Sequence, residues 1–142
     1  MLEYKIWNAT ENMPINQPFD QFIPPLKNVL IVDDDVDFRL SLSEVLVANG
    51  YRVLTAKNGE DALNLLNNIS KLPDLILIDL LMPILGGLEF RKIQLNHHLF
   101  SSVPVVFVSG NGYVVGERSF QKPILIHQFL KEVEEILNLT FH

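Results

Sequence analysis

The fold class of this chain is decided by the stretch Leu75-Ile76-Leu77-Ile78-Asp79-Leu80-Leu81-Met82-Pro83. Its first four residues are all apolar, as expected of a central parallel strand that is buried on both faces. The apolar run ends at Asp79, and a buried carboxylate is costly unless a metal ion or a cation lies beside it. The stretch therefore predicts a buried strand with a charged site at its carboxyl end.

Three other stretches also place polar residues where an apolar run ends. They are residues 31–35, which end in Asp33-Asp34-Asp35, residues 106–110, which contain Ser109, and residues 121–123, which contain Lys122 and Pro123. In an open parallel sheet the carboxyl ends of the strands line one crevice, and ligands bind there. We therefore expect three carboxylates, a hydroxyl and an amine to converge at one edge of a sheet.

The rest of the chain alternates between strand and helix patterns from residue 28 onward. Strands are expected at residues 29–32, 51–56, 75–78, 105–108 and 119–121, with amphipathic helices after the first, second, third and fifth of them. Asp35 and Asn58 are expected to cap the first two helices. Strands that alternate with helices predict a doubly wound α/β sheet.

The composition of the chain excludes several classes of function. The chain has 142 residues, enough for one domain with a real core. Eleven Lys and Arg against 17 Asp and Glu give a net charge of −6, which argues against a general binder of nucleic acid or anionic membranes. The absence of Cys excludes disulfides and thiolate metal sites. No apolar run resembles a membrane span or a signal peptide, so a cytoplasmic location is expected.

Residues 1–27 differ from the rest and are expected to form an N-terminal extension. They are rich in Asn, Gln and Pro and show no regular period, yet they carry Trp7, Phe19 and Phe22. Two interpretations stay open: a partly disordered leader, or an arm that docks its aromatic side chains on the domain or on a partner. The domain itself is expected to span residues 28–139, with residues 140–142 as a tail.

The four polar stretches together suggest a specific chemistry. Asp33, Asp34 and Asp79 would supply oxygen ligands to Mg²⁺. Asp79, ionised beside the metal, could act as a nucleophile on phosphorus and become an aspartyl phosphate. Lys122 offers a compact charge that can pair with a carboxylate or a phosphoryl oxygen. Ser109 can donate a hydrogen bond to a phosphoryl oxygen.

With these motifs in place, the sequence resembles the receiver domain of two-component response regulators over residues 28–139. The resemblance rests on the acidic pair Asp33-Asp34, on Asp79 followed by Met82-Pro83, on Ser109 after an apolar strand and on Lys122-Pro123. It implies a flavodoxin-like fold with five parallel strands in the order 2-1-3-4-5. It also implies a histidine kinase or a histidine phosphotransfer protein as phosphodonor, an unknown downstream protein as partner, and no enzymatic activity beyond self-catalysed phosphotransfer and dephosphorylation.

The resemblance also assigns roles to residues. Asp79 would be the phosphoacceptor. Asp34 would bind Mg²⁺ directly, Asp33 largely through water, and Leu81 through its backbone carbonyl. Ser109 and Lys122 would hold the phosphoryl group.

The chain departs from the family between Ser109 and Lys122, which are only thirteen positions apart. The segment is short and rich in glycine, so the fourth helix of the family is expected to be absent or reduced to a turn. We therefore do not expect the dimer that many receivers form through that helix, and the N-terminal extension is a candidate cover for the exposed face. Ser119 occupies the position where an aromatic switch residue is common, and Phe120 is one place off.

Two other functions stay open. The chain could be a receiver-like scaffold that binds a partner independently of phosphorylation, which the shortened segment favours. It could also be a haloacid-dehalogenase-like phosphatase, since Asp33 and Asp35 have the Asp-x-Asp spacing of that class, although Asp79 and the small size of the chain do not fit it.

Overall fold

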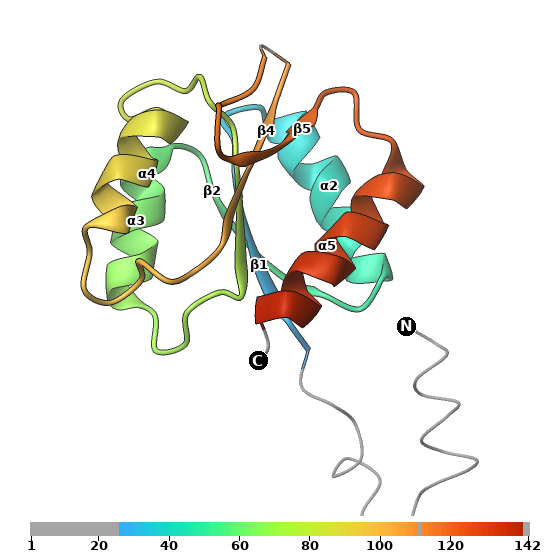
Figure 1. Cartoon of the computed structure of the whole chain (residues 1–142), viewed down its shortest axis with the longest axis horizontal. Helices are drawn as coiled ribbons and strands as arrows, with labels where there is room; N and C mark the ends of the chain where they lie inside the picture. Colours follow the sequence, from blue (N-terminus) through green and yellow to red (C-terminus); the bar gives the residue numbers. More distant parts are fainter. Residues whose placement is uncertain (1–25, 111, 141–142) are drawn as a thin grey trace, which may run out of the picture.

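A five-stranded parallel sheet lies at the centre of the molecule, with the strands in the order β2-β1-β3-β4-β5 (Figure 1). In this computed structural model the described residues are 26–110 and 112–140, so both interpretations of the leader lie outside them. The strands are β1 (Asn28–Val32), β2 (Arg52–Ala56), β3 (Leu75–Ile78), β4 (Val105–Ser109) and β5 (Arg118–Gln121). The predicted strand order is confirmed.

Helices cover both faces of the sheet (Figure 1). The helices α2 (Val36–Ala48) and α5 (Ile126–Thr140) pack on one face, and α3 (Gly59–Asn68) and α4 (Gly87–Leu95) pack on the other. Each face has its own hydrophobic core, and all residues of β1, β3 and β4 are buried between the two. The predicted flavodoxin-like α/β fold is confirmed. Within the described part of the chain, no helix has the length and hydropathy needed to cross a membrane.

The first two helices begin at the predicted caps. The Asp35 carboxylate accepts a hydrogen bond from the Phe38 backbone N–H at 3.1 Å, and the Asn58 side chain accepts one from the Asp61 N–H at 2.8 Å. Both bonds satisfy donors that have no partner inside the helix. The capping residue Asp35 lies two residues beyond Asp33, so α2 begins at the carboxyl edge of the sheet.

The described part of the connection between β4 and β5, residues 110 and 112–117, contains no helix. The family's fourth helix, which would follow β4 and is not the element labelled α4 here, is therefore absent or reduced, as predicted. An ion pair from α4 to Glu117 holds the short connection instead. The Arg91 guanidinium bonds Glu117 at 3.1 Å and the Gln94 side-chain oxygen at 2.6 Å. Val114 packs on the core beneath α3 and α4. The connection therefore closes this side of the sheet without a helix.

Gln94 is a fully buried amide that organises the turn after α4. Its Nε2 donates to the carbonyl oxygens of Phe100 at 2.8 Å, Ser101 at 3.2 Å and Val103 at 3.1 Å. A buried polar group is tolerated only when it is hydrogen-bonded in this way. Gln94 thus links the end of α4 to the chain that leads into β4.

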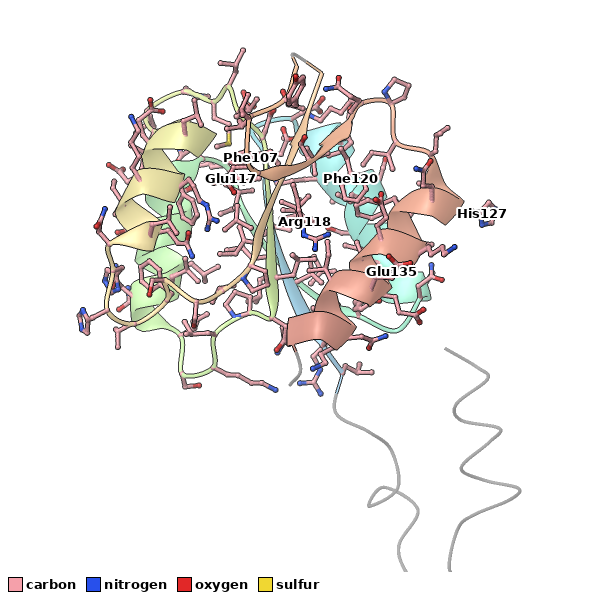
Figure 2. All side chains as sticks on the ribbon, viewed as in Figure 1. Phe107, Glu117, Arg118, Phe120, His127 and Glu135 are labelled. Atoms are coloured by element: carbon pink, nitrogen blue, oxygen red, sulfur yellow. The ribbon has the colours of Figure 1, made fainter. Side chains whose placement is uncertain are left out.

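Side chains alternate between the two faces of β5, and that of Phe120 points toward α5. Its ring meets that of Phe129 edge-on with centroids 4.9 Å apart, while Glu117 lies on the α4 side (Figure 2). Ser119 precedes Phe120 in the strand, so its side chain points to the opposite face. An aromatic side chain on the α4 side of β5 is therefore missing at this position.

Candidate functional site

The backbone brings the polar residues to one edge of the sheet. The Asp33 N–H donates to the Ala56 carbonyl at 3.1 Å, and the Asp79 N–H donates to the Val32 carbonyl at 3.0 Å. The Lys122 N–H donates to the Ser109 carbonyl at 3.1 Å. These bonds extend the strand ladders by one residue, so the polar side chains that follow the strands all leave from the same edge.

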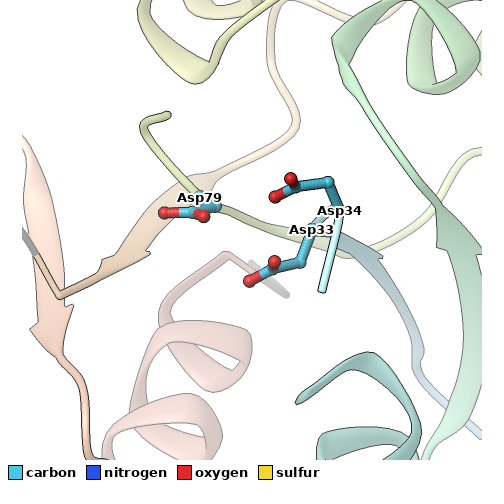
Figure 3. A group of neighbouring side chains, drawn as sticks. All are labelled: Asp33, Asp34 and Asp79. Atoms are coloured by element: carbon cyan, nitrogen blue, oxygen red, sulfur yellow. The ribbon is translucent and has the colours of Figure 1, made fainter. Parts of the chain in front are cut away.

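Three carboxylates cluster there. Asp33, Asp34 and Asp79 each present an oxygen atom within 4.8 Å of the others, above the ends of β1 and β3 (Figure 3). Asp33 is buried, the Asp79 side chain is 13% exposed, and Asp34 is open to solvent. This donor set fits Mg²⁺, which prefers oxygen ligands and keeps several waters, because the open side at Asp34 leaves room for water.

Lys122 supplies the positive charge at this edge. Its ammonium lies 2.8 Å from Asp33 Oδ2 and 3.7 Å from Asp79 Oδ2, and its side chain is 22% exposed. The peptide bond between Lys122 and Pro123 is cis. A single cation thus contacts two of the three carboxylates, with the shorter contact to Asp33.

Burial raises the pKa of Asp79, and the negative charge of Asp33 raises it further. The charge of Lys122, the Leu80 N–H and a hydrogen bond from the Ser109 side chain oppose the rise in this pKa. The Leu80 N–H donates to Asp79 Oδ1 at 2.8 Å. Asp79 is therefore a carboxylate in a crowded acidic environment, where a divalent cation would favour the ionised form.

The first turn of α2 holds Asp33 in place. Asp33 Oδ1 accepts a hydrogen bond from the Asp35 N–H at 2.9 Å, and the backbone carbonyl of Asp33 accepts one from Arg39 Nη1 at 2.7 Å. Asp35 itself caps α2. This role leaves Asp35 no part in the carboxylate cluster and argues against the Asp-x-Asp phosphatase interpretation.

Leu81 lies in the loop that joins β3 to α4, two residues after Asp79, and its side chain is 65% exposed. The same loop contains Ile84 at φ 72°, where the Leu85 N–H donates to the Pro83 carbonyl at 2.8 Å. This is a tight turn in a left-handed conformation that a β-branched residue rarely adopts. The loop path is held at its other end by the Gly87 N–H, which donates to the Leu80 carbonyl at 2.9 Å.

Gly87 lies against the backbone of Asp79. A Cβ atom built on Gly87 would stand 2.2 Å from the Asp79 carbonyl oxygen and 3.1 Å from the Leu80 Cα. Only glycine permits this approach without a shift of the chain. The pair Gly86-Gly87 thus allows α4 to begin directly beside the strand end that carries Asp79.

The structure brings together five of the residues expected in the site: Asp33, Asp34, Asp79, Ser109 and Lys122. Sequence reasoning missed Arg39 and Phe38. Arg39 bonds the backbone of Asp33, and the Phe38 ring lies under the Lys122 ammonium, 4.1 Å from it to the ring centroid. Phe38 recurs at helical spacing with Leu42 and Leu46, which by itself indicates only a core position in α2.

Comparison with known proteins agrees with this geometry. The response regulator receiver domain matches residues 29–122. The chain is 36% identical over 103 residues to a probable transcriptional regulator ycf27 of Guillardia theta, and 38% identical over 87 residues to a CpxR homolog of Haemophilus influenzae, a transcriptional regulatory protein. These matches cover 70% and 61% of this chain but only 37% and 36% of the relatives, so the chain spans little more than a third of their length.

Solved structures show the same fold. A putative response regulator of Chloroflexus aurantiacus superposes with a TM-score of 0.73 at 28% identity, covering 80% of this chain and 99% of that one. The chemotaxis response regulator CheY4 of Vibrio cholerae gives 0.70 at 26% identity, covering 79% and 99%. Receiver domains bind Mg²⁺ at an acidic pocket and work with histidine kinases or phosphotransfer proteins in two-component systems. With its fold, its acidic edge and these matches, this chain belongs to the response regulator receiver domain family.

Proposed function

We propose that this protein is a phosphoacceptor receiver that is phosphorylated on Asp79 in a Mg²⁺-dependent reaction and signals through protein contacts. The observation that carries the proposal is the convergence of three carboxylate oxygens within 4.8 Å, with the Lys122 ammonium 3.7 Å from Asp79. A cation site, a carboxylate nucleophile and a fixed positive charge are the parts that phosphoryl transfer to an aspartate needs.

The chemistry follows from the partners of Asp79. Oδ1 accepts the Leu80 N–H, while Oδ2 faces Lys122. Oδ2 attacks the phosphorus of the donor, a new O–P bond forms in line with the breaking bond to the leaving group, and the leaving group departs with the bonding electron pair. With a phosphohistidine donor the imidazole leaves, and with acetyl phosphate the acetate leaves.

The surrounding residues stabilise the charge that is transferred. Lys122 pairs with a phosphoryl oxygen, and Ser109 turns its hydroxyl from the Asp79 carboxylate to another oxygen of the same group. The residues that would hold Mg²⁺ are Asp33, Asp34, Asp79 and, through its backbone carbonyl, Leu81; bound there, the ion would supply positive charge to neutralise the phosphoryl oxygens. Positioning and charge neutralisation supply most of the rate enhancement in such reactions.

Intact mass after incubation with acetyl phosphate tests the proposal. Wild-type protein should gain one phosphoryl group with Mg²⁺ and none with a chelator, and Asp79→Asn should gain none under either condition. Asp35→Asn is the matched control, because Asn also caps helices and Asp35 lies outside the cluster. Equal labelling of wild type and Asp79→Asn would overturn the assignment.

We further propose that residues 28–139 form the receiver, that residues 1–27 are an extension of it, and that the protein works in the cytoplasm. The phosphodonor is a histidine kinase or a histidine phosphotransfer protein, and neither nucleic acid nor a membrane is required. The output is contact with a downstream protein, as is usual for receivers. We do not expect the protein to form a dimer through a fourth helix.

A second function is favoured by the short connection between β4 and β5. Loss of that helix removes a surface that receivers often use to signal their state, so the chain could act as a scaffold with a constant partner. Affinity for a captured partner separates the two functions. Binding that strengthens on phosphorylation supports the receiver, and equal binding by phosphorylated wild type and Asp79→Asn supports the scaffold.

A further inference from the structure

Lys122 is held by three groups, and only two of them are carboxylates. Its ammonium lies 2.8 Å from Asp33 Oδ2, 3.7 Å from Asp79 Oδ2 and 4.1 Å from the centroid of the Phe38 ring. A cation over the face of an aromatic ring is attracted by the negative charge of that face. The ring therefore provides a third, non-acidic attraction for the lysine.

Phe38 is rigidly placed for this contact. Its backbone N–H is bound by the Asp35 cap at 3.1 Å, and its side chain packs against the core between the sheet, α2 and α5. Phe38, Asp33 and Asp79 also line one gap beneath the site that has no room for a water molecule. Because the Lys122 side chain is only 22% exposed, its contact with the ring is partly shielded from solvent, which strengthens it relative to an exposed pair.

We propose that Phe38 is a positioning residue that keeps the Lys122 ammonium between Asp33 and Asp79, where it can reach the phosphoryl group. The proposal rests on the proposed function. Without the ring, the shorter and more buried contact to Asp33 would dominate, and the lysine would be drawn away from Asp79. The ring face attracts the ammonium over a broad area, so the lysine can move from Asp33 toward a phosphoryl oxygen without losing this attraction.

Three variants test the proposal in the full chain. Phe38→Leu keeps an apolar side chain in the core but removes the ring, and Phe38→Tyr keeps the ring. Phe120→Leu is the matched control, because Phe120 packs on the same core from β5 but meets Phe129 instead of the lysine. The rate of phosphoryl gain from acetyl phosphate with Mg²⁺ is measured for each, together with the NMR shifts of the Lys122 ε-methylene protons in the untreated protein.

The expected result is a rate that falls roughly two- to fivefold in Phe38→Leu, the size of a partly shielded cation–π contact. Phe38→Tyr and Phe120→Leu should keep the wild-type rate. The Lys122 ε-protons should be shifted upfield by the ring in wild type and Phe38→Tyr, and this shift should vanish in Phe38→Leu. The NMR reading of wild type and Phe38→Tyr holds even if Phe38→Leu folds poorly.

Several results would overturn the proposal. They are an unshifted lysine in wild type, an unchanged rate in Phe38→Leu, or an equal loss of rate in Phe38→Tyr or Phe120→Leu, which would mark a packing effect. Wild-type protein that gains no phosphoryl group overturns the proposed function and the rate effect with it. In that case the lysine shift still reports separately whether Phe38 holds the ammonium.

Discussion

Gly87→Ala should displace Asp79, the proposed phosphoacceptor, by pushing on its backbone. The added methyl group would stand 2.2 Å from the Asp79 carbonyl oxygen, whereas ordinary contacts begin at 3.4 Å, so the two must separate by 3.4 − 2.2 = 1.2 Å. The obstacle is backbone and cannot rotate away. Overpacking of this kind costs about 1–3 kcal/mol, which corresponds to a fall in Tm of about 4–13 °C for a domain of this size.

The same shift should slow phosphoryl transfer. Gly87 also donates its N–H to the Leu80 carbonyl at 2.9 Å, and Leu80 in turn donates to Asp79 Oδ1. A displacement of about 1 Å at a reacting group can lower a rate by roughly 100-fold. The assay is urea unfolding monitored by circular dichroism, followed by intact mass against time with Mg²⁺ and acetyl phosphate at a temperature where the variant is folded.

Gly110→Ala is the matched control for stability. Among the described residues, and apart from its chain neighbours, nothing lies within 4 Å of a Cβ at Gly110, and this glycine is not among those with positive φ. Its stability should change by less than about 1 kcal/mol. If Gly87→Ala proves as stable as wild type and gains the phosphoryl group at the same rate, the close approach of α4 to Asp79 does not position the site.

Three further predictions concern charge, burial and metal. In metal-free protein, Asp79→Asn should be more stable than wild type at neutral pH, because the raised pKa of Asp79 marks an ionised state that folding disfavours. Protonation of Asp79 removes this penalty, so the stability advantage of Asp79→Asn over wild type should grow as pH rises from below 3.8 through the pKa of Asp79 in the folded state. Urea unfolding of both proteins over a pH series checks this, and an advantage that persists unchanged in acid contradicts it. Gln94→Met should cost about 1–3 kcal/mol in urea unfolding, since it leaves buried carbonyl groups without a donor; an unchanged midpoint would show that water replaces the amide. Mg²⁺ at a concentration 100 times Kd should raise the free energy of unfolding of wild type and of Asp35→Asn by about 2.7 kcal/mol, and thus their Tm, but should have little effect on Asp34→Asn. Equal stabilisation of all three proteins would place the ion elsewhere.

The sequence was sufficient for the fold because local signals and the overall pattern agree. The apolar run at residues 75–78 is buried as predicted, and Asp35 and Asn58 cap the helices predicted for them. The cluster of Asp33, Asp34 and Asp79 was also predictable, because strand ends in a parallel sheet converge whatever the details of packing.

What the sequence could not predict depends on contacts between distant segments. Phe38 reads as a core residue in any helical pattern, and its contact with Lys122 depends on where β5 ends relative to α2. Gln94 reads as a solvent-facing residue, since the carbonyl groups that satisfy it come from the turn after α4. Gly87 looks like an ordinary helix start until the Asp79 carbonyl is seen beside it. The roles of these three residues can be recognised only from the three-dimensional path of the chain.

The most direct test of the central claim is the location of the phosphoryl group. After treatment with acetyl phosphate and Mg²⁺, borohydride reduction followed by trypsin and tandem mass spectrometry maps the modified aspartate. Tryptic cleavage separates residues 72–91, which contain Asp79, from residues 28–39, which contain Asp33, Asp34 and Asp35. Modification at Asp79 alone is the predicted result. Modification at Asp33, Asp34 or Asp74, or at no aspartate in protein that binds Mg²⁺, would contradict the account.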